Sequence, residues 1–194
     1  MLPLQPSFYQ RHALEVARDL LGCRLVRLTG DGQRLAGIIL ETEAYQGEED
    51  LGCHARHGLT PRTRVMYGPP GHAYIYFTYG MHWLLNAVTG PEGTPAAVLL
   101  RAIQPAEGRE TMAAFRPALA HTPRWTDGPA KLTQALALTG QQNGFDLCNP
   151  AGELFIEPGD RFSDERVQTG PRVGLFTVPE PWKSIPWRFT IKTK

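Results

Sequence analysis

The clearest hydrophobic pattern in the chain lies within residues 36–54. An apolar run, Ile38 to Leu40, comes first, as in a buried strand. Glu41, Glu43 and Tyr45 follow at alternate positions, and alternate residues of a strand share one face. A carboxylate that enters a core is costly unless it is paired or takes part in chemistry. An edge strand with a solvated acidic face would explain this pattern by itself. The tyrosine-rich stretch from Tyr74 to Met81 favours a functional strand instead.

Apolar periodicity and turn residues predict the other elements. Helical spacing indicates helices at residues 8–21 and 107–119, and a third that begins at Asp127 and stops at Gly140. Gly30 to Gly32 predict one hairpin turn and Tyr79 to Met81 a second. Strands are expected over residues 23–29, 73–79, 83–88, 94–104, 153–157, 172–177 and 187–192.

The order of these elements predicts the fold class. Strands follow one another closely and helices are inserted between them, which indicates one α+β domain over residues 1–194, with a mainly antiparallel sheet, flanking helices and a protruding β-hairpin. The chain is 42% hydrophobic and 20% charged, as is usual for a soluble globular protein.

Targeting and cysteine signals are few. The first residues include no long apolar stretch, so no secretion signal is expected, and no run approaches the length of a membrane span. The three cysteines are far apart and include no Cys-x-x-Cys pair, so neither a disulfide framework nor a zinc site is expected. This cysteine usage suits a reducing cytoplasm.

Charge is unevenly distributed although its total is only +1. Residues 41–50 carry five carboxylates and no cation, whereas residues 54–106 carry four arginines and one acid, Glu92. This distribution is compatible with a phosphate-binding face, and chance clustering on a solvated surface is the alternative. Residues 47–72 form a long irregular segment rich in arginine, which favours a functional loop.

Arg101 ends an apolar strand, and such an arginine should have a buried anionic partner. Glu41 and Glu43 are the natural candidates, while an arginine that only extends to the edge of the sheet is the alternative. Three tyrosines also lie close together, Tyr74, Tyr76 and Tyr79. Each could simply belong to a half-buried sheet surface.

Together, the aromatic turn, the arginine-rich loop and the carboxylate suit an enzyme that extrudes a base from duplex DNA. Such an enzyme needs a wedge, an aromatic pocket and a group that activates a nucleophile. The chain resembles the alkyladenine (3-methyladenine) DNA glycosylase family in six stretches that keep their order and spacing: Glu41-Thr42-Glu43-Ala44-Tyr45 with His54, Thr60-Pro61-Arg62-x-Arg64, Tyr74-Ile75-Tyr76-x-x-Tyr79-Gly80-Met81 with Asn86, Val98-Leu99-Leu100-Arg101-Ala102, Gly128-Pro129-Ala130-Lys131-Leu132 and Arg172-Val173-Gly174.

The resemblance implies a curved antiparallel sheet and a glycosylase that needs no metal and no cofactor. It implies a monomer that acts on double-stranded DNA containing damaged purines, in the bacterial cytoplasm at the nucleoid, or in the nucleus of a eukaryote. Glu43 resembles the general base that deprotonates a water. Arg101 and the main-chain carbonyl of Val173 resemble the other groups that hold this water.

The resemblance also assigns the base pocket. Tyr45, His54 and Tyr76 resemble the side chains that sandwich the flipped base, and Asn86 the residue that crowds the 2-amino group of guanine. Tyr79 resembles the residue that fills the vacated stack. The other residues that the resemblance assigns resemble those that contact the DNA backbone: Arg56, Thr60, Arg62, Arg64, Met81 and Lys131.

Lysine usage bears on the reaction type. Lys131 is the first lysine of the chain, so the segments 36–54 and 73–101 offer no amine for a Schiff-base lyase step. This favours a monofunctional glycosylase. Two other classes stay open: a non-catalytic module that binds distorted nucleic acid, against which Glu43 and Arg101 argue, and a nucleoside hydrolase, which would have no use for a projecting Tyr79.

Overall fold

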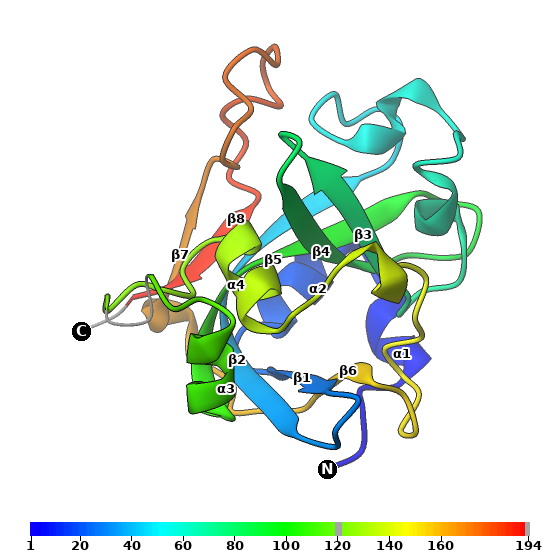
Figure 1. Cartoon of the computed structure of the whole chain (residues 1–194). Helices are drawn as coiled ribbons and strands as arrows, with labels where there is room; N and C mark the ends of the chain where they lie inside the picture. Colours follow the sequence, from blue (N-terminus) through cyan, green and yellow to red (C-terminus); the bar gives the residue numbers. More distant parts are fainter. Residues whose placement is uncertain (119–121, 193–194) are drawn as a thin grey trace.

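In the computed structural model, which describes residues 1–118 and 122–192, a single antiparallel sheet curls into a half-barrel with few helices (Figure 1). The strands are β1 (Arg24–Leu28), β2 (Arg34–Gln46), β3 (Ala73–Thr78), β4 (His82–Val88), β5 (Ala96–Glu107), β6 (Leu154–Glu157), β7 (Val167–Gly170) and β8 (Arg188–Ile191). The α-helices are α1 (Pro6–Tyr9), α2 (Ala13–Asp19), α3 (Arg109–Ala114) and α4 (Pro129–Ala135). Short 3-10 turns are η1 (His54–His57), η2 (Arg64–Tyr67), η3 (Gly140–Gln142) and η4 (Asp164–Arg166). The predicted α+β class is confirmed.

The sheet is organised around β2, whose two edges are both occupied. The strand order is β3-β4-β5-β2-β1-β6, and β8 joins β2 beyond the end of β1 and carries β7 with it. Register shifts interrupt the β2–β5 pairing near Ala36 and on both sides of Glu41, and such bulges bend a strand. The alternative of an edge strand with a solvated face is therefore wrong.

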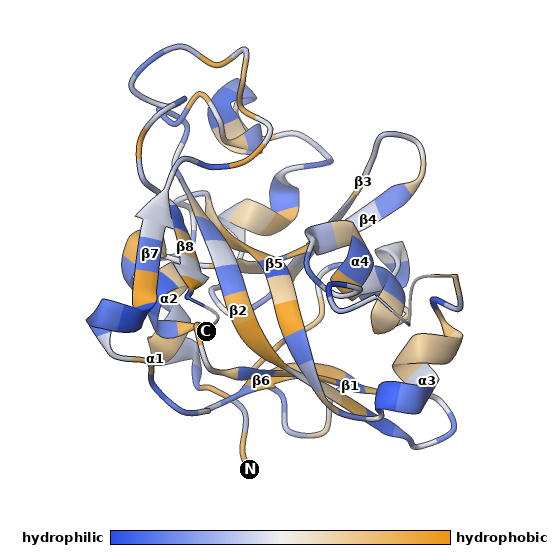
Figure 2. Cartoon of the chain, turned by 90° about the vertical axis from the view of Figure 1, so that its left-hand side faces the viewer, coloured by the Kyte–Doolittle hydropathy of each residue, from blue (hydrophilic) through white to orange (hydrophobic). Residues whose placement is uncertain are grey.

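Helices cover one side of the curved sheet and bury its apolar residues. α2 contacts β2 and β5, and α4 contacts β4 and β5. Both hydrophobic and hydrophilic residues lie along β2 and β5 (Figure 2), since these strands carry core side chains and charged ones. Within the described ranges, none of the helices has the length and apolar character that crossing a membrane requires.

The first predicted helix is split in the structure. A single helix over residues 8–21 was expected, but α1 ends at Tyr9 and α2 starts at Ala13. The side chain of His12 caps α2 by accepting a hydrogen bond from the amide of Leu14 at 3.3 Å. Tyr9 is fully buried, so the chain turns between the two helices to place this ring in the core.

The later helices are shorter than predicted. β5 continues to Glu107, so α3 starts two residues late and ends at Ala114, while the predicted end at Leu119 lies outside the described residues. The next helix, α4, ends at Ala135 instead of Gly140. Ala137, at a φ of 49°, takes the left-handed conformation that ends helices.

The expected strand at residues 172–177 is wrong. These residues form turns, and the strand lies earlier, in β7. The amide of Val173 bonds a side chain instead of a neighbouring strand, and Gly174 has a φ of +85°. The sequence pattern therefore misled the prediction, because the main-chain N–H of Val173 binds Glu43 instead of pairing in a strand.

The β3–β4 hairpin forms as predicted and projects from the sheet (Figure 1). Its turn places Tyr79 at φ 52° and Gly80 at φ 66°, the signs required at the centre of a type I′ turn. A tyrosine in the left-handed region is strained, and such strain is concentrated at functional sites. The Tyr79 side chain is 82% exposed, so the tip presents it to solvent.

Candidate active site

Three segments far apart in sequence meet at one end of the molecule. The β3–β4 tip, the loop of residues 47–72 (cyan) and the loop of residues 171–187 (orange to red) all lie at the top of Figure 1. Between them is a cavity of about 310 Å³, a size suited to one small planar ligand. Its lining includes the following residues predicted for the site: Tyr45, His54, Tyr76, Tyr79, Asn86, Arg101 and Val173.

Glu43 is fully buried behind this wall, and three of the cavity-lining residues hold its carboxylate. The Tyr45 hydroxyl donates to Oε2 at 2.9 Å, and the main-chain N–H of Val173 donates to Oε1 at 2.7 Å. Arg101 Nη1 lies 3.3 Å from Oε1. The carboxylate thus has one charged partner and two neutral hydrogen-bond donors.

Arg101 also binds Glu41, as the sequence predicted. Its Nε donates to Glu41 Oε1 at 2.9 Å, and Arg188 Nη1 on β8 reaches the same oxygen at 3.2 Å. Glu41, Glu43 and Tyr45 share one face of β2, which confirms the alternation. The alternative in which Arg101 only extends to the sheet edge is wrong, because its guanidinium bridges both carboxylates.

Electrostatics distinguish the members of this group. Burial raises the pKa of the Glu43 carboxyl above its ordinary value, although Arg101 and the donors Val173 and Tyr45 oppose that shift. Burial and the Glu43 charge raise the pKa of Tyr45, so this hydroxyl stays protonated and donates. Burial opposes the charge of Arg101, but Glu43 and Glu41 outweigh it and raise the pKa of Arg101.

The aromatic wall is held by its own contacts. His54 stacks edge-on against Tyr76 with ring centroids 4.4 Å apart, and its Nδ1 lies 3.0 Å from the Tyr74 hydroxyl. Burial and the nearby arginines Arg62 and Arg56 lower the pKa of His54 to about 4, so the ring is neutral at physiological pH. Uncharged aromatic rings of this kind can stack on an aromatic ligand.

Asn86, on β4, lines the cavity and is buried. Its Nδ2 donates to the main-chain oxygen of Tyr74 at 3.0 Å, which fixes the orientation of the amide. The structure places Asn86 in the cavity lining, and its role in choosing the base stays a prediction.

The loop of residues 47–72 carries the expected arginines on its exposed side. Arg56 and Arg64 are exposed, and the Arg56 guanidinium donates to the main-chain oxygen of Leu51 at 2.6 Å. Arg62 is also exposed, but its guanidinium lies 5.1 Å from the Tyr76 ring centroid, within the range of a cation–π contact. Arg62 therefore contacts the Tyr76 ring of the cavity lining, which the sequence did not indicate.

The other predicted backbone contacts lie at different places. Thr60 is half-buried, with its hydroxyl 2.9 Å from that of Thr63, and Met81 is exposed at the hairpin tip. Lys131, at the start of α4, pairs with Asp127. The described cavity-lining residues include no lysine.

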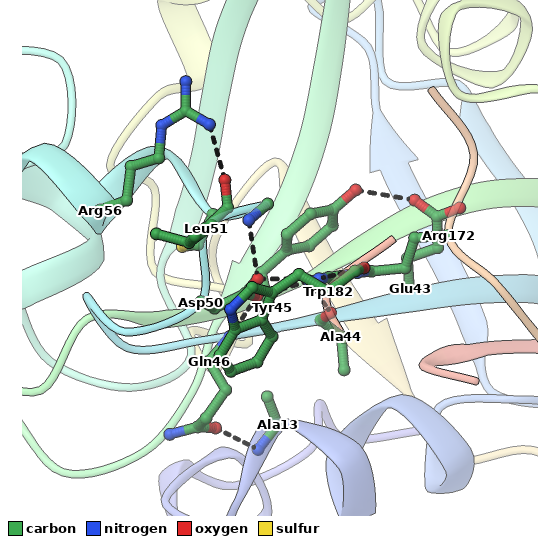
Figure 3. A network of polar contacts seen from close by, with 12 residues as sticks. Ala13, Glu43, Ala44, Tyr45, Gln46, Asp50, Leu51, Arg56, Arg172 and Trp182 are labelled. Atoms are coloured by element: carbon green, nitrogen blue, oxygen red, sulfur yellow. Dashed lines mark hydrogen bonds and ion pairs between the residues drawn. The ribbon is translucent and has the colours of Figure 1, made fainter. Parts of the chain in front are cut away.

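Sequence reasoning missed two residues at this site, Asp50 and Arg172. Both side chains are fully buried and paired with each other, although 122 positions separate them (Figure 3). Asp50 was counted in the acidic run, and Arg172 entered only as part of the matched motif Arg172-Val173-Gly174. The available signal was an arginine next to a predicted catalytic residue.

A metal site does not emerge from the described parts of the chain, residues 1–118 and 122–192. Groups of three or more histidine, cysteine, aspartate or glutamate side chains suited to a metal ion are absent there. The three cysteines, in the same ranges, are free thiols.

Comparison with known proteins agrees with this geometry. The model of the methylpurine-DNA glycosylase family matches residues 7–194. A Methanocella arvoryzae protein named "Putative 3-methyladenine DNA glycosylase" is 48% identical over 97% of this chain and 92% of its own length. Proteins with the same name from Myxococcus xanthus and Carboxydothermus hydrogenoformans are 48% and 44% identical, over 97% and 99% of this chain and 90% and 95% of their own lengths. The chain therefore belongs to the methylpurine-DNA glycosylase family, whose members are hydrolases of N-glycosyl bonds.

Proposed function

We propose that this enzyme is a monofunctional glycosylase that flips alkylated or deaminated purines out of duplex DNA and hydrolyses the N-glycosidic bond with a water activated by Glu43. The observation that carries the proposal is a buried carboxylate whose three partners, Tyr45, Arg101 and Val173, all line one aromatic cavity. A base-sized space beside an activated carboxylate is what base excision by water requires.

In the proposed reaction, Glu43 accepts a proton from water, whose oxygen attacks the sugar C1′. Arg101 and the main-chain carbonyl of Val173 hold the water. The bond from C1′ to the base nitrogen breaks and its electron pair leaves with the base. A purine alkylated at a ring nitrogen carries a positive charge and departs neutral, so this leaving group needs no general acid. A neutral deaminated purine such as hypoxanthine leaves as an anion, which takes up a proton from the solvent.

Recognition of the base follows from the cavity wall. We assign Tyr45, His54 and Tyr76 to the rings that stack on the flipped base, which favours electron-poor alkylated purines. A neutral His54 suits a cationic base, because a protonated imidazole would repel it. Asn86 restricts the space beside the purine 2-amino group.

Outside the cavity, the proposal assigns DNA contacts to the exposed end of the molecule. Tyr79 fills the stack that the base has left, where an aromatic ring replaces part of the lost stacking. We assign a group of residues to contacts with the DNA phosphates, which position the duplex without reading its sequence. Its members are Arg56, Thr60, Arg62, Arg64, Met81 and Lys131.

The test is base release from duplex oligonucleotides that each contain one lesion, such as 3-methyladenine, 7-methylguanine, hypoxanthine or ethenoadenine, with the corresponding nucleosides as controls. We expect release of free base from DNA, an intact abasic strand and no release from nucleosides. Binding without release would instead indicate a non-catalytic module, and release from nucleosides a nucleoside hydrolase. Strand cleavage, together with a covalent protein–DNA adduct that borohydride traps, would contradict the monofunctional assignment.

A further inference from the structure

A buried ion pair joins two loops behind the candidate active site. Arg172 Nη1 and Nη2 bind the two carboxylate oxygens of Asp50 at 2.5 and 2.8 Å (Figure 3). Asp50 also accepts the main-chain N–H groups of Gln46 and Gly52, at 3.2 and 2.9 Å. The carboxylate is thus saturated with donors, and it links the end of β2 to the loop of residues 171–187.

Stability by itself does not account for this pair. Both side chains are fully buried, and removing two charges from water costs about as much as their attraction returns. A well-packed apolar pair would often be equally stable. A buried pair between segments distant in sequence is better explained by the geometry that it imposes on its neighbours.

The first neighbour is Tyr45. The Arg172 guanidinium carbon lies 4.7 Å from the Tyr45 ring centroid and 5.1 Å from that of Trp187, so the planar ion contacts both rings. Arg172 Nη1 also donates to the main-chain oxygen of Ala44 at 3.1 Å. These contacts fix the ring whose hydroxyl donates to Glu43 at 2.9 Å.

The second neighbour is Val173, the next residue in the chain. Its side chain is exposed, so packing of that side chain contributes little to its placement. Its N–H nevertheless lies 2.7 Å from Glu43 Oε1. Because Arg172 is anchored in the interior, the adjoining peptide is held against the carboxylate. Two of the three groups that bind Glu43 therefore depend on Arg172.

Close packing at Gly52 reinforces this arrangement. A Cβ at Gly52 would lie 2.8 Å from Arg172 Nη2 and 2.6 Å from Leu175 Cδ1. The loop can approach the guanidinium only because this position has no side chain. The loops that carry Asp50 and Arg172 are therefore fitted to each other directly behind the cavity.

We propose that the Asp50–Arg172 pair is a positioning unit that holds the Tyr45 hydroxyl and the Val173 amide on Glu43 and so keeps the general base charged and oriented. This inference rests on the proposed role of Glu43. The charged and titratable groups around that carboxylate are Arg101 on β5, Glu41 and Tyr45 on β2, Tyr76 on β3, and Arg188 on β8, which binds Glu41. Arg172 acts on it through Tyr45 and Val173.

The decisive variant is Arg172→Lys, which keeps the charge but loses the planar two-nitrogen fork. Single-turnover base release from a lesion duplex is measured against pH, together with the Kd for the same duplex. We expect the rate at neutral pH to fall roughly 10- to 100-fold, as for a displaced catalytic group. We also expect the acidic limb of the profile to move up by about half a pH unit or more, because a Glu43 carboxylate with fewer donors binds a proton more readily.

The control is Arg34→Lys, since Arg34 is likewise paired with carboxylates, those of Glu107 and Glu157, but lies at the other end of β2. It should leave the acidic limb in place. An Arg172→Lys profile that is lower at every pH with an unmoved limb would overturn the proposal, because a purely structural defect reduces only the amount of active enzyme.

A double-mutant cycle with Tyr45→Phe tests the route of the effect. If Arg172 acts partly through the Tyr45 hydroxyl, Arg172→Lys should cost less in the Tyr45→Phe background than in the wild type. Equal losses in both backgrounds, together with an unmoved limb, would contradict the inference. Should Arg172→Lys fail to fold by circular dichroism, Asp50→Asn replaces it in the same cycle with the same criteria.

Failure of the inference is distinguishable from failure of the proposed function. If Glu43→Gln retains the wild-type rate, the role of Glu43 itself is wrong. If Glu43→Gln is inactive while Arg172→Lys and Asp50→Asn match the wild-type rate and pH limb, only the positioning role is wrong.

Discussion

Two clusters of arginine and glutamate lie at opposite ends of the β2–β5 pair, and only one of them borders the cavity. At the cavity end, Arg101 and Arg188 bind Glu41, and Arg101 also reaches Glu43. At the other end, the corresponding network consists of ion pairs among two arginines and two glutamates: Arg24 with Glu107, Arg34 with Glu107, and Arg34 with Glu157.

The clusters contain the same residue types in the same numbers, but Glu43 and Glu107 differ in solvation. The Glu43 side chain is fully buried and receives two of its three contacts from neutral donors. The Glu107 side chain is 37% exposed and is paired with two arginines. Ion pairing alone therefore does not distinguish the proposed general base, Glu43, from Glu107. Burial beside a cavity, with neutral donors, gives a carboxylate that can both hold a charge and take up a proton.

The largest expected difference between the clusters comes from neutralising one glutamate in each. Glu43→Gln should fold and bind lesion DNA but lose roughly 10²- to 10⁴-fold in single-turnover base release, the usual cost of losing a general base. Glu107→Gln should keep its activity and lose at most about 1 kcal/mol of stability, since partly exposed ion pairs contribute little.

Rates from single-turnover assays and unfolding midpoints from calorimetry check both outcomes. Glu41→Gln is the matched control on the same strand face. Should Glu41→Gln abolish release while Glu43→Gln retains it, the general base has been assigned to the wrong carboxylate.

The exposed apolar side chains at the two ends should also differ in effect. Tyr79→Ser should weaken the flipped complex roughly 5- to 100-fold, since base–aromatic stacking is worth about 1–3 kcal/mol. Leu2→Ser, at an exposed apolar residue far from the cavity, should have no such effect. The loss should be greatest for lesions that still pair well, because their extrusion costs most.

A lesion-dependent fluorescence signal reports the flip for paired, mispaired and single-stranded substrates. Tyr76→Ala, in the pocket wall, should reduce release from all of these substrates alike. An equal defect of Tyr79→Ser on paired and single-stranded DNA, or its unfolding, would show that the ring is not a wedge.

The pH profile gives a third comparison. A general base works only when deprotonated, so the rate should fall about tenfold per unit as pH drops below the pKa of Glu43. Burial raises that pKa, so the limb should lie above the ordinary glutamate value of about 4.3. His54, with a pKa of about 4, should add no separate limb between about pH 5 and 8.

Single-turnover rates from about pH 4 to 9 measure this profile, with Glu107→Gln as the control that should leave it unchanged. A limb that moves in Glu107→Gln, or a second limb near pH 6.5 that disappears in His54→Gln, would contradict the assignment.

A smaller effect is expected at Asn86, which affects choice of base more than rate. Asn86→Ser or Asn86→Ala should raise release of guanine-type bases relative to hypoxanthine by roughly tenfold, within the range for steric discrimination in a pocket. The change frees space beside the purine 2-amino group and removes the contact with the Tyr74 main-chain oxygen. Paired assays on 7-methylguanine and hypoxanthine duplexes give the ratio, and an unchanged ratio would place the discrimination elsewhere.

The smallest expected effect is that of a chelator. Carboxylates in both clusters are bound by arginines, so activity should persist within about twofold after exhaustive dialysis against EDTA. Base release before and after this treatment is the measurement. A sharp loss that only an added divalent ion restores would contradict the prediction.

Local pattern determined much of this protein from sequence alone. Alternation placed Glu41, Glu43 and Tyr45 on one face, because the side-chain period of a strand is fixed by its backbone. The dipeptide Tyr79-Gly80 marked the hairpin tip, since its turn needs positive φ values. Arg101 was matched to its acidic partners, because a buried arginine needs an anion nearby.

The tertiary structure decided what depends on residues far apart in the chain. The helix expected at residues 8–21 divides because Tyr9 must reach the core, and the strand expected at 172–177 is lost because Val173 uses its amide to bind Glu43. The pairing of Asp50 with Arg172 spans 122 positions and has no local signature. Residue type and spacing determine local backbone conformation. The partner of a buried charge is determined only in the folded protein, because folding of the sheet excludes water from that charge.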